Sequence, residues 1–195
     1  MSLKKLSSFG VLAIAGALFI SGCDLFVGDA GKITITLKDD PFPYTDVSEA
    51  RITINRIEVK GASGTQNWLV ADLSREIDLL TLRDGNTTVL VSDIEIPAGD
   101  YTGLRIHLAS GADLILSDGT TISGDRGSDA PVIVDVPQFT FDHGEDDARA
   151  LVDFAMDESF AVQRDPGTQA IESFAYTPVL RTESFLLNDE PLEMP

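Results

Sequence analysis

Apolar and polar residues alternate along much of the chain after residue 31. The first such stretch places Ile33, Ile35 and Leu37 on one side, and lysine and threonine residues on the other. A period of two is typical of a β-strand with one buried face, because successive side chains of a strand point to opposite sides. The pattern therefore predicts a strand over residues 32–37, which the prolines after Asp40 end.

A second strand is predicted over residues 49–61, and its pattern changes phase near Asn55. Apolar residues occupy even positions up to Ile54 and odd positions from Ile57 onward. A slip of one residue turns every later side chain to the opposite face of a sheet. The phase change therefore predicts a β-bulge, or a crossing between two sheets, near residues 55–56.

The rest of the chain repeats this pattern of short apolar runs between turn residues. Further strands are predicted over residues 66–71, 87–96, 101–108, 114–116, 120–122, 132–141, 150–154, 159–162 and 173–181. The Asp118-Gly119 pair between two apolar runs predicts a hairpin. Residues 75–82 are ambiguous between a helical turn and a strand, and Trp68 is expected in the core. The pattern predicts an all-β protein, an antiparallel β-sandwich of about eight to ten short strands with Greek-key-like connections.

Residues 1–22 have a different character from the rest of the chain. Lys4 and Lys5 precede an uninterrupted run of mostly apolar residues from Phe9 to Ile20, and two small residues follow it. This is the three-part pattern of a secretory signal peptide. The apolar run is too short for a membrane-spanning helix, which needs about 20 residues. The segment predicts export.

The end of this segment, Ile20-Ser21-Gly22-Cys23, resembles the bacterial lipobox. The resemblance implies that Cys23 is lipidated with a diacylglyceryl thioether, and usually a third amide-linked fatty acid such as palmitate, and becomes the first residue of the mature lipoprotein. Two or more acyl chains anchor a protein stably, whereas one chain binds only marginally. An ordinary signal peptide with an incidental cysteine is the alternative interpretation.

These features divide the chain into four parts: a signal peptide (1–22), a tether (23–30), a β-sandwich domain (31–182) and a flexible acidic tail (183–195). We expect the exported protein to be lipid-anchored to the cell membrane or the outer membrane, facing the periplasm or the cell surface. Asp24 follows the cysteine. An aspartate at this position resembles an inner-membrane retention signal of enteric bacteria, but other phyla do not follow that rule, so the choice of membrane stays open.

Several landmarks of the strand pattern also occur together in one known family. They are Ile33-Thr34-Ile35-Thr36-Leu37-Lys38-Asp39-Asp40-Pro41, the strand from Ile52 to Val59, Asp78-Leu79-Leu80-Thr81-Leu82, Pro97-Ala98-Gly99-Asp100-Tyr101, Val152-Asp153-Phe154 and Pro178-Val179-Leu180-Arg181. Their order and spacing resemble the bacterial and archaeal family called domain of unknown function 4382. The resemblance implies an exported, often lipid-anchored β-domain and supplies no catalytic residues.

Charge and cysteine content exclude several classes of function. The net charge is −18, and without the two lysines of the signal peptide 12 basic residues face 32 acidic ones, a net charge of −20. Such a surface repels nucleic acids and anionic lipid headgroups. Cys23 is the only cysteine, so no disulfide can form within the chain.

The densest polar cluster is Asp142-His143-Gly144-Glu145-Asp146-Asp147. Asp142, Glu145 and Asp146 are candidate metal ligands, because Ca²⁺ takes six to eight oxygen ligands and a loop of closely spaced carboxylates can supply several of them. The spacing does not fit an EF-hand loop, and acidic residues at a hairpin tip are often simply solvated. Candidate distant contributors are Asp39, Asp40, Asp153 and Asp157.

Other chemistry has weaker support. The only histidines are His107 and His143, so a catalytic zinc site would need carboxylates to complete it. Serine-nucleophile and phosphate-loop motifs are absent from the sequence.

We therefore expect no catalytic residues and no cofactor, with Ca²⁺ as the alternative. The expected function is a non-catalytic interaction or structural module of the cell envelope. The expected partners are the membrane, through lipid on Cys23, and an unidentified envelope protein or glycan. A calcium- or carbohydrate-binding module is the alternative, and a hydrolase is a more distant one.

Overall fold

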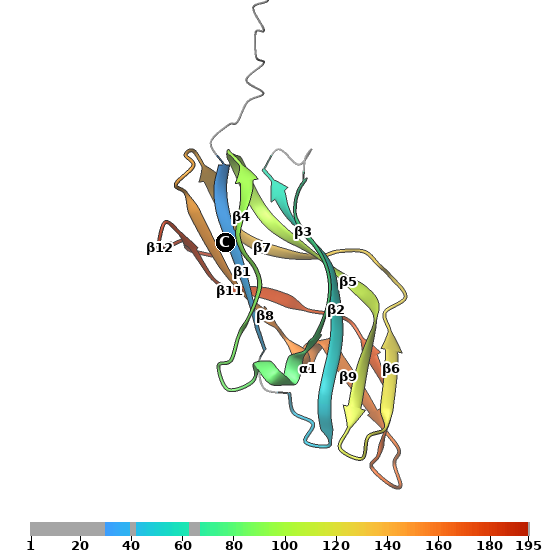
Figure 1. Ribbon diagram of the computed structural model, residues 1–195. Helices are drawn as coiled ribbons and strands as arrows, with labels where there is room; N and C mark the ends of the chain where they lie inside the picture. The colour runs from blue at the N-terminus through green and yellow to red at the C-terminus, as the bar shows by residue number, and fades with distance from the viewer. Residues whose placement is uncertain (1–29, 40–41, 63–66, 195) are drawn as a thin grey trace, which may run out of the picture.

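The computed structural model describes residues 30–39, 42–62 and 67–194, and these residues form two β-sheets packed face to face (Figure 1). The first sheet has the strand order β12 (Glu190–Pro191), β11 (Leu180–Leu187), β8 (Asp147–Phe154), β1 (Ala30–Asp39), β4 (Thr88–Pro97). The second has the order β3 (Asn67–Asp78), β2 (Val47–Gly61), β5 (Gly99–Leu116), β6 (Thr121–Asp125), and β7 (Val132–Phe141) pairs with the other half of the same β5 edge. The predicted all-β sandwich is confirmed.

Three smaller elements complete the fold. A separate hairpin of β9 (Phe160–Arg164) and β10 (Ile171–Tyr176) lies beside β6 (Figure 1). The 3₁₀-helix η1 (Leu79–Leu82) follows β3, and the short helix α1 (Met156–Ser159) precedes β9. Within the described residues, no helix is long and apolar enough to cross a membrane.

The core follows from the two-residue alternation. Ile33, Ile35 and Leu37 on β1 are fully buried, as the sequence pattern predicts. On β2 the inward set changes from Ile54 to Ile57, and the pairing with both neighbouring strands shifts register between residues 54 and 56. The predicted β-bulge is therefore present, and it keeps the apolar residues on both sides of it pointing into the core.

One strand pair departs from the predicted antiparallel arrangement. β1 runs parallel to β8, with Lys32 opposite Asp147 and Asp39 opposite Phe154. Parallel neighbours need a long crossover connection, and here most of the chain lies between the two strands. Local alternation carries no information about this pairing, because it is the same for a strand with a parallel or an antiparallel neighbour.

The sandwich has two ends, each formed by a different set of turns. We call the end where β1 begins at Ala30 the proximal pole; it also carries the loop of residues 142–146 and the turn of residues 188–189. The opposite end, the distal pole, carries the β5–β6 turn and the β9–β10 turn (Figure 1).

An aromatic cluster fills the core toward the proximal pole. Tyr101 packs against Phe139 and Phe141 with ring centroids 5.3 Å and 6.0 Å away, and Phe139 also contacts Phe185 at 4.8 Å. The buried Tyr101 hydroxyl donates a hydrogen bond of 2.6 Å to the carbonyl of Pro97, which closes the β4–β5 turn. Burial raises the pKa of this phenol, so the hydroxyl remains a donor over the whole ordinary pH range.

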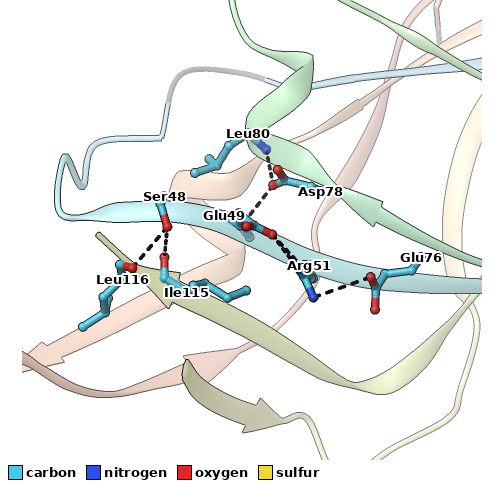
Figure 2. Close-up of polar contacts among 9 residues, drawn as sticks. Ser48, Glu49, Arg51, Glu76, Asp78, Leu80, Ile115 and Leu116 are labelled. Atoms are coloured by element: carbon cyan, nitrogen blue, oxygen red, sulfur yellow. Dashed lines mark hydrogen bonds and ion pairs between the residues drawn. The ribbon is translucent and has the colours of Figure 1, made fainter. Parts of the chain in front are cut away.

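Polar side chains fix the distal part of β2 (Figure 2). The Ser48 hydroxyl lies within 3.0 Å of the carbonyl of Ile115 and 3.2 Å of that of Leu116 on β5. One oxygen of Asp78 accepts hydrogen bonds from the backbone N–H of Ala50 and of Leu80. Asp78 therefore caps the first turn of η1 and joins it to β2.

The structure corrects several of the predicted elements, and the strands predicted over residues 101–108 and 114–116 form the single strand β5. The ambiguous residues 75–82 contain both alternatives, because β3 continues to Asp78 and η1 follows it. The strand predicted over residues 173–181 is two strands, β10 and β11, separated by residues 177–179 with Pro178 between them. The predicted tail boundary at residue 183 lies inside β11, which continues to Leu187 and buries Phe185.

Candidate functional site

Cys23, the predicted lipidation site, lies outside the described residues, and so do the signal peptide and most of the tether. β1 begins at Ala30, where its pairing with β4 places Ala30 opposite Pro97. The N–H of Lys32 donates to the carbonyl of Asp146 at 2.8 Å. The chain that follows Cys23 therefore joins the sandwich at the proximal pole.

The predicted metal-ligand loop lies at this same pole, where it connects β7 to β8. Within it, Asp146 acts as a structural residue. One of its carboxylate oxygens accepts the backbone N–H of Asp142 at 2.7 Å and that of His143 at 2.9 Å, and the other accepts the side-chain amide of Asn188 at 3.0 Å. These hydrogen bonds lower the pKa of Asp146, because they stabilise the ionised carboxylate.

The other two candidates in the loop, Asp142 and Glu145, are exposed. An open recess of about 490 Å³ lies beside them, lined by His143, Glu145, Asp146, Asp147, Asn188 and Asp189. Arg149 reaches its edge and forms ion pairs of 2.6 Å with both Asp147 and Asp189. Among the described residues, no group of three or more histidine, cysteine, aspartate or glutamate side chains is arranged to hold a metal ion.

The more distant acidic candidates do not join this loop. Asp39 and Asp153 lie on the adjacent strands β1 and β8, but Lys38 is opposite Asp153 and Phe154 is opposite Asp39. Because paired residues share a face, the two carboxylates belong to opposite faces of the sheet. Asp157 is exposed on α1, and Asp40 lies outside the described residues.

Asp153 belongs to a group of charges on the outer face of the first sheet. Lys38 forms ion pairs with Asp153, at 4.0 Å, and with Glu183. Arg181 on the next strand binds the exposed Glu158 at 2.6 Å. Each of these acids forms an ion pair with a basic side chain, so the group acts as a structural network on the sheet surface.

The two histidines lie on different elements. His107 is half-buried on the outer face of β5, and its Nε2 is 3.2 Å from a carboxylate oxygen of Glu58. His143 lies in the loop at the proximal pole. The structure therefore places His107 in a side-chain hydrogen bond with Glu58.

Aromatic side chains in the described part of the chain are all buried or half-buried. Trp68 packs against the core, as expected, and Tyr44 lies under the guanidinium of Arg164 at 5.4 Å. Sugar-binding surfaces commonly stack a ring on an exposed aromatic face. Among the described aromatic side chains none is exposed; Trp68 and Tyr44 are half-buried.

A second recess lies at the distal pole, and the sequence pattern gave no sign of it. We call it the distal groove; it has a volume of about 250 Å³ and is lined by Asp46, Leu116, Ser117, Asp118, Ala170 and Ile171. It forms between the β5–β6 turn and the β9–β10 hairpin. The Asp118-Gly119 signal placed one of these turns correctly, but only the packing of the second hairpin creates the groove.

Arg164 fixes the hairpin against the rest of the domain. Its two terminal nitrogens bind the two carboxylate oxygens of Asp46 at 2.7 Å and 2.9 Å. The guanidinium of Arg164 lowers the pKa of the Asp46 carboxyl, mainly through these hydrogen bonds. On β10, the ring of Phe174 lies directly against Gly124 of β6, where no larger side chain fits.

The fold and these contacts define a single all-β sandwich whose polar clusters mainly hold its loops and edges together. A family model described as a domain of unknown function (DUF4382) matches residues 30–171, which is more than half of the chain. The chain belongs to this family. Comparison with curated proteins and with solved structures found no match.

Proposed function

We propose that this protein is a lipoprotein of the bacterial cell envelope, anchored through Cys23, whose β-sandwich serves as a non-catalytic interaction module. The observation that carries the proposal is the position of the first strand. Only six residues separate Cys23 from Ala30, where β1 begins. Fully extended, a segment of this length spans about 25 Å at most.

This short connection supports a defined orientation. A lipid anchor on Cys23 holds the proximal pole near the membrane surface, and the distal pole then faces away from it. The net charge of −20 after residue 22 opposes electrostatic binding to anionic lipids, so attachment depends on the acyl chains.

The use of the acidic residues supports a non-catalytic role. Asp146 closes its own loop, Asp46 binds Arg164, and Asp147 and Asp189 share Arg149. A catalytic carboxylate must be free to face substrate, whereas each of these carboxylates is bound to a neighbouring part of the chain.

The anchor is tested by replacing Cys23 with Ser in the full-length protein expressed in a bacterium. We expect the wild type to incorporate labelled palmitate and to sediment with membranes. The Cys23→Ser variant is expected to carry no label. Equal labelling of both proteins would contradict the proposal.

A further inference from the structure

The distal groove combines an apolar floor with acidic flanks. Leu116 and Ile171 provide the apolar surface, while Asp46 and Asp118 lie at its sides. A volume of about 250 Å³ is below the range of about 300–1,000 Å³ that holds a drug-sized ligand. The groove is therefore of a size for one extended side chain.

The walls of the groove are held in place by hydrogen bonds. The backbone N–H of Ser117 donates to the carbonyl of Asp46 at 2.9 Å, and the Ser117 hydroxyl donates to the same oxygen at 3.1 Å. The Ser48 hydroxyl lies 3.2 Å from the carbonyl oxygen of Leu116 (Figure 2). These contacts fix the end of β5 relative to the start of β2, so the groove exists before a partner binds.

Of the two acidic flanks, Asp118 supplies the net negative charge. Asp118 is exposed, and its carboxylate accepts the backbone N–H of Thr120 at 2.8 Å. This hydrogen bond lowers the pKa of Asp118. Asp46 is largely neutralised by Arg164, so Asp118 and the acidic surface as a whole supply the attraction for a positive group.

We propose that the distal groove binds a lysine or arginine side chain from a basic segment of a partner protein. The aliphatic stem of such a side chain lies on Leu116 and Ile171, and its charged end reaches Asp118. Long basic side chains combine an apolar stem with a positively charged tip. The groove offers an apolar surface for the stem and a carboxylate for the tip. The net charge of −18 steers a basic partner toward the molecule.

This inference rests on the proposed role as an interaction module and names the chemistry of its partner. The location supports it: the groove is lined by residues of the β5–β6 turn and the β9–β10 hairpin, and these two turns lie at the pole opposite the start of β1 (Figure 1). The larger recess at the proximal pole lacks the apolar floor, and Arg149 already occupies two of its carboxylates.

The test measures binding of a fluorescein-labelled octalysine peptide to the full-length protein in non-ionic detergent, by fluorescence anisotropy. Matched variants separate the groove from bulk charge. Asp118→Asn and Glu145→Gln remove the same charge from the distal and the proximal pole, and both positions are exposed. Ala170→Arg and Ala98→Arg add the same charge at the two poles, again at exposed positions.

We expect the wild type to bind the peptide and Asp118→Asn to weaken binding about two- to fivefold, the effect of one exposed ion pair. Ala170→Arg, which also fills the groove, is expected to weaken binding further. Glu145→Gln and Ala98→Arg should change affinity by less than about 1.5-fold, because screening limits their reach to about 8 Å at physiological salt. Equal effects at the two poles, or no binding by the wild type, would overturn the inference. Palmitate labelling of Cys23 is independent of this result.

Discussion

Gly31 is the position where the packing of the sandwich can be tested most sharply. A Cβ atom added at Gly31 would lie 2.4 Å, 2.5 Å and 2.7 Å from three ring carbons of Phe141. Ordinary contacts between carbon atoms are about 3.5–4.0 Å, so the ring must move by about 1 Å. Phe141 is only 1% exposed and is enclosed by Tyr101 and Phe139, so it has little room to move.

Gly31→Ala is therefore expected to destabilise the protein by about 1–3 kcal/mol, the usual effect of overpacking a core. For a chain of this size, 1 kcal/mol corresponds to about 2–4 °C in Tm, which gives a decrease of about 2–12 °C. The assay is thermal unfolding of the full chain followed by circular dichroism.

Gly111→Ala serves as the matched control. Gly111 also lies in a strand, and its added Cβ would meet only the carbonyl oxygen of Gly124 at 3.7 Å, an ordinary contact. We expect its Tm to remain within about 2 °C of the wild type. If Gly31→Ala has the same Tm as Gly111→Ala, Phe141 does not pack on β1 and the proposed arrangement of the proximal core is wrong.

Three further predictions follow from individual hydrogen bonds. Tyr101→Phe removes the 2.6 Å bond to the buried turn at Pro97 and should cost about 0.5–1.5 kcal/mol in urea unfolding; an unchanged midpoint would show that this bond is not formed. Because the pKa of Asp146 is lowered in the folded state, its contribution to stability is present above the ordinary carboxyl pKa and disappears as pH falls through the lower folded value. Hydrogen exchange of the two N–H groups that Asp146 holds should therefore rise relative to the core below about pH 4, and constant protection down to pH 2 would contradict this. Arg75 donates from β3 to the carbonyl of Val89 at 2.6 Å on the open edge of β4, so Arg75→Ala should increase self-association in analytical ultracentrifugation, whereas Arg75→Lys should do so less.

The sequence predicted the individual strands better than the way in which they pair. Residues 32–37, the bulge after Ile54 and the hairpin at Asp118 all depend on neighbours close in the chain, and each is present in the structure. The parallel pairing of β1 with β8 joins residues more than 110 positions apart. No local pattern records such a contact, because either direction of pairing buries the same alternating face.

In the candidate sites too, the sequence predicts what depends on nearby residues and does not predict contacts between distant ones. The acidic loop was visible in the sequence, but the role of Asp146 depends on Asn188, which comes from a turn 42 residues away. Residues 75–82 are ambiguous from the sequence because their apolar residues do not settle a period; in the structure β3 continues to Asp78, which then caps the 3₁₀-helix. The distal groove could not be predicted at all, since two hairpins separated in sequence form it.

The most direct test of the account is the mass of the N-terminal peptide of the protein purified from bacterial membranes. A proteolytic digest analysed by mass spectrometry should contain a peptide that begins at Cys23 and carries a diacylglyceryl group, with or without a third acyl chain. A peptide that begins elsewhere, or an unmodified Cys23 in protein recovered from the membrane, would contradict the proposed anchor.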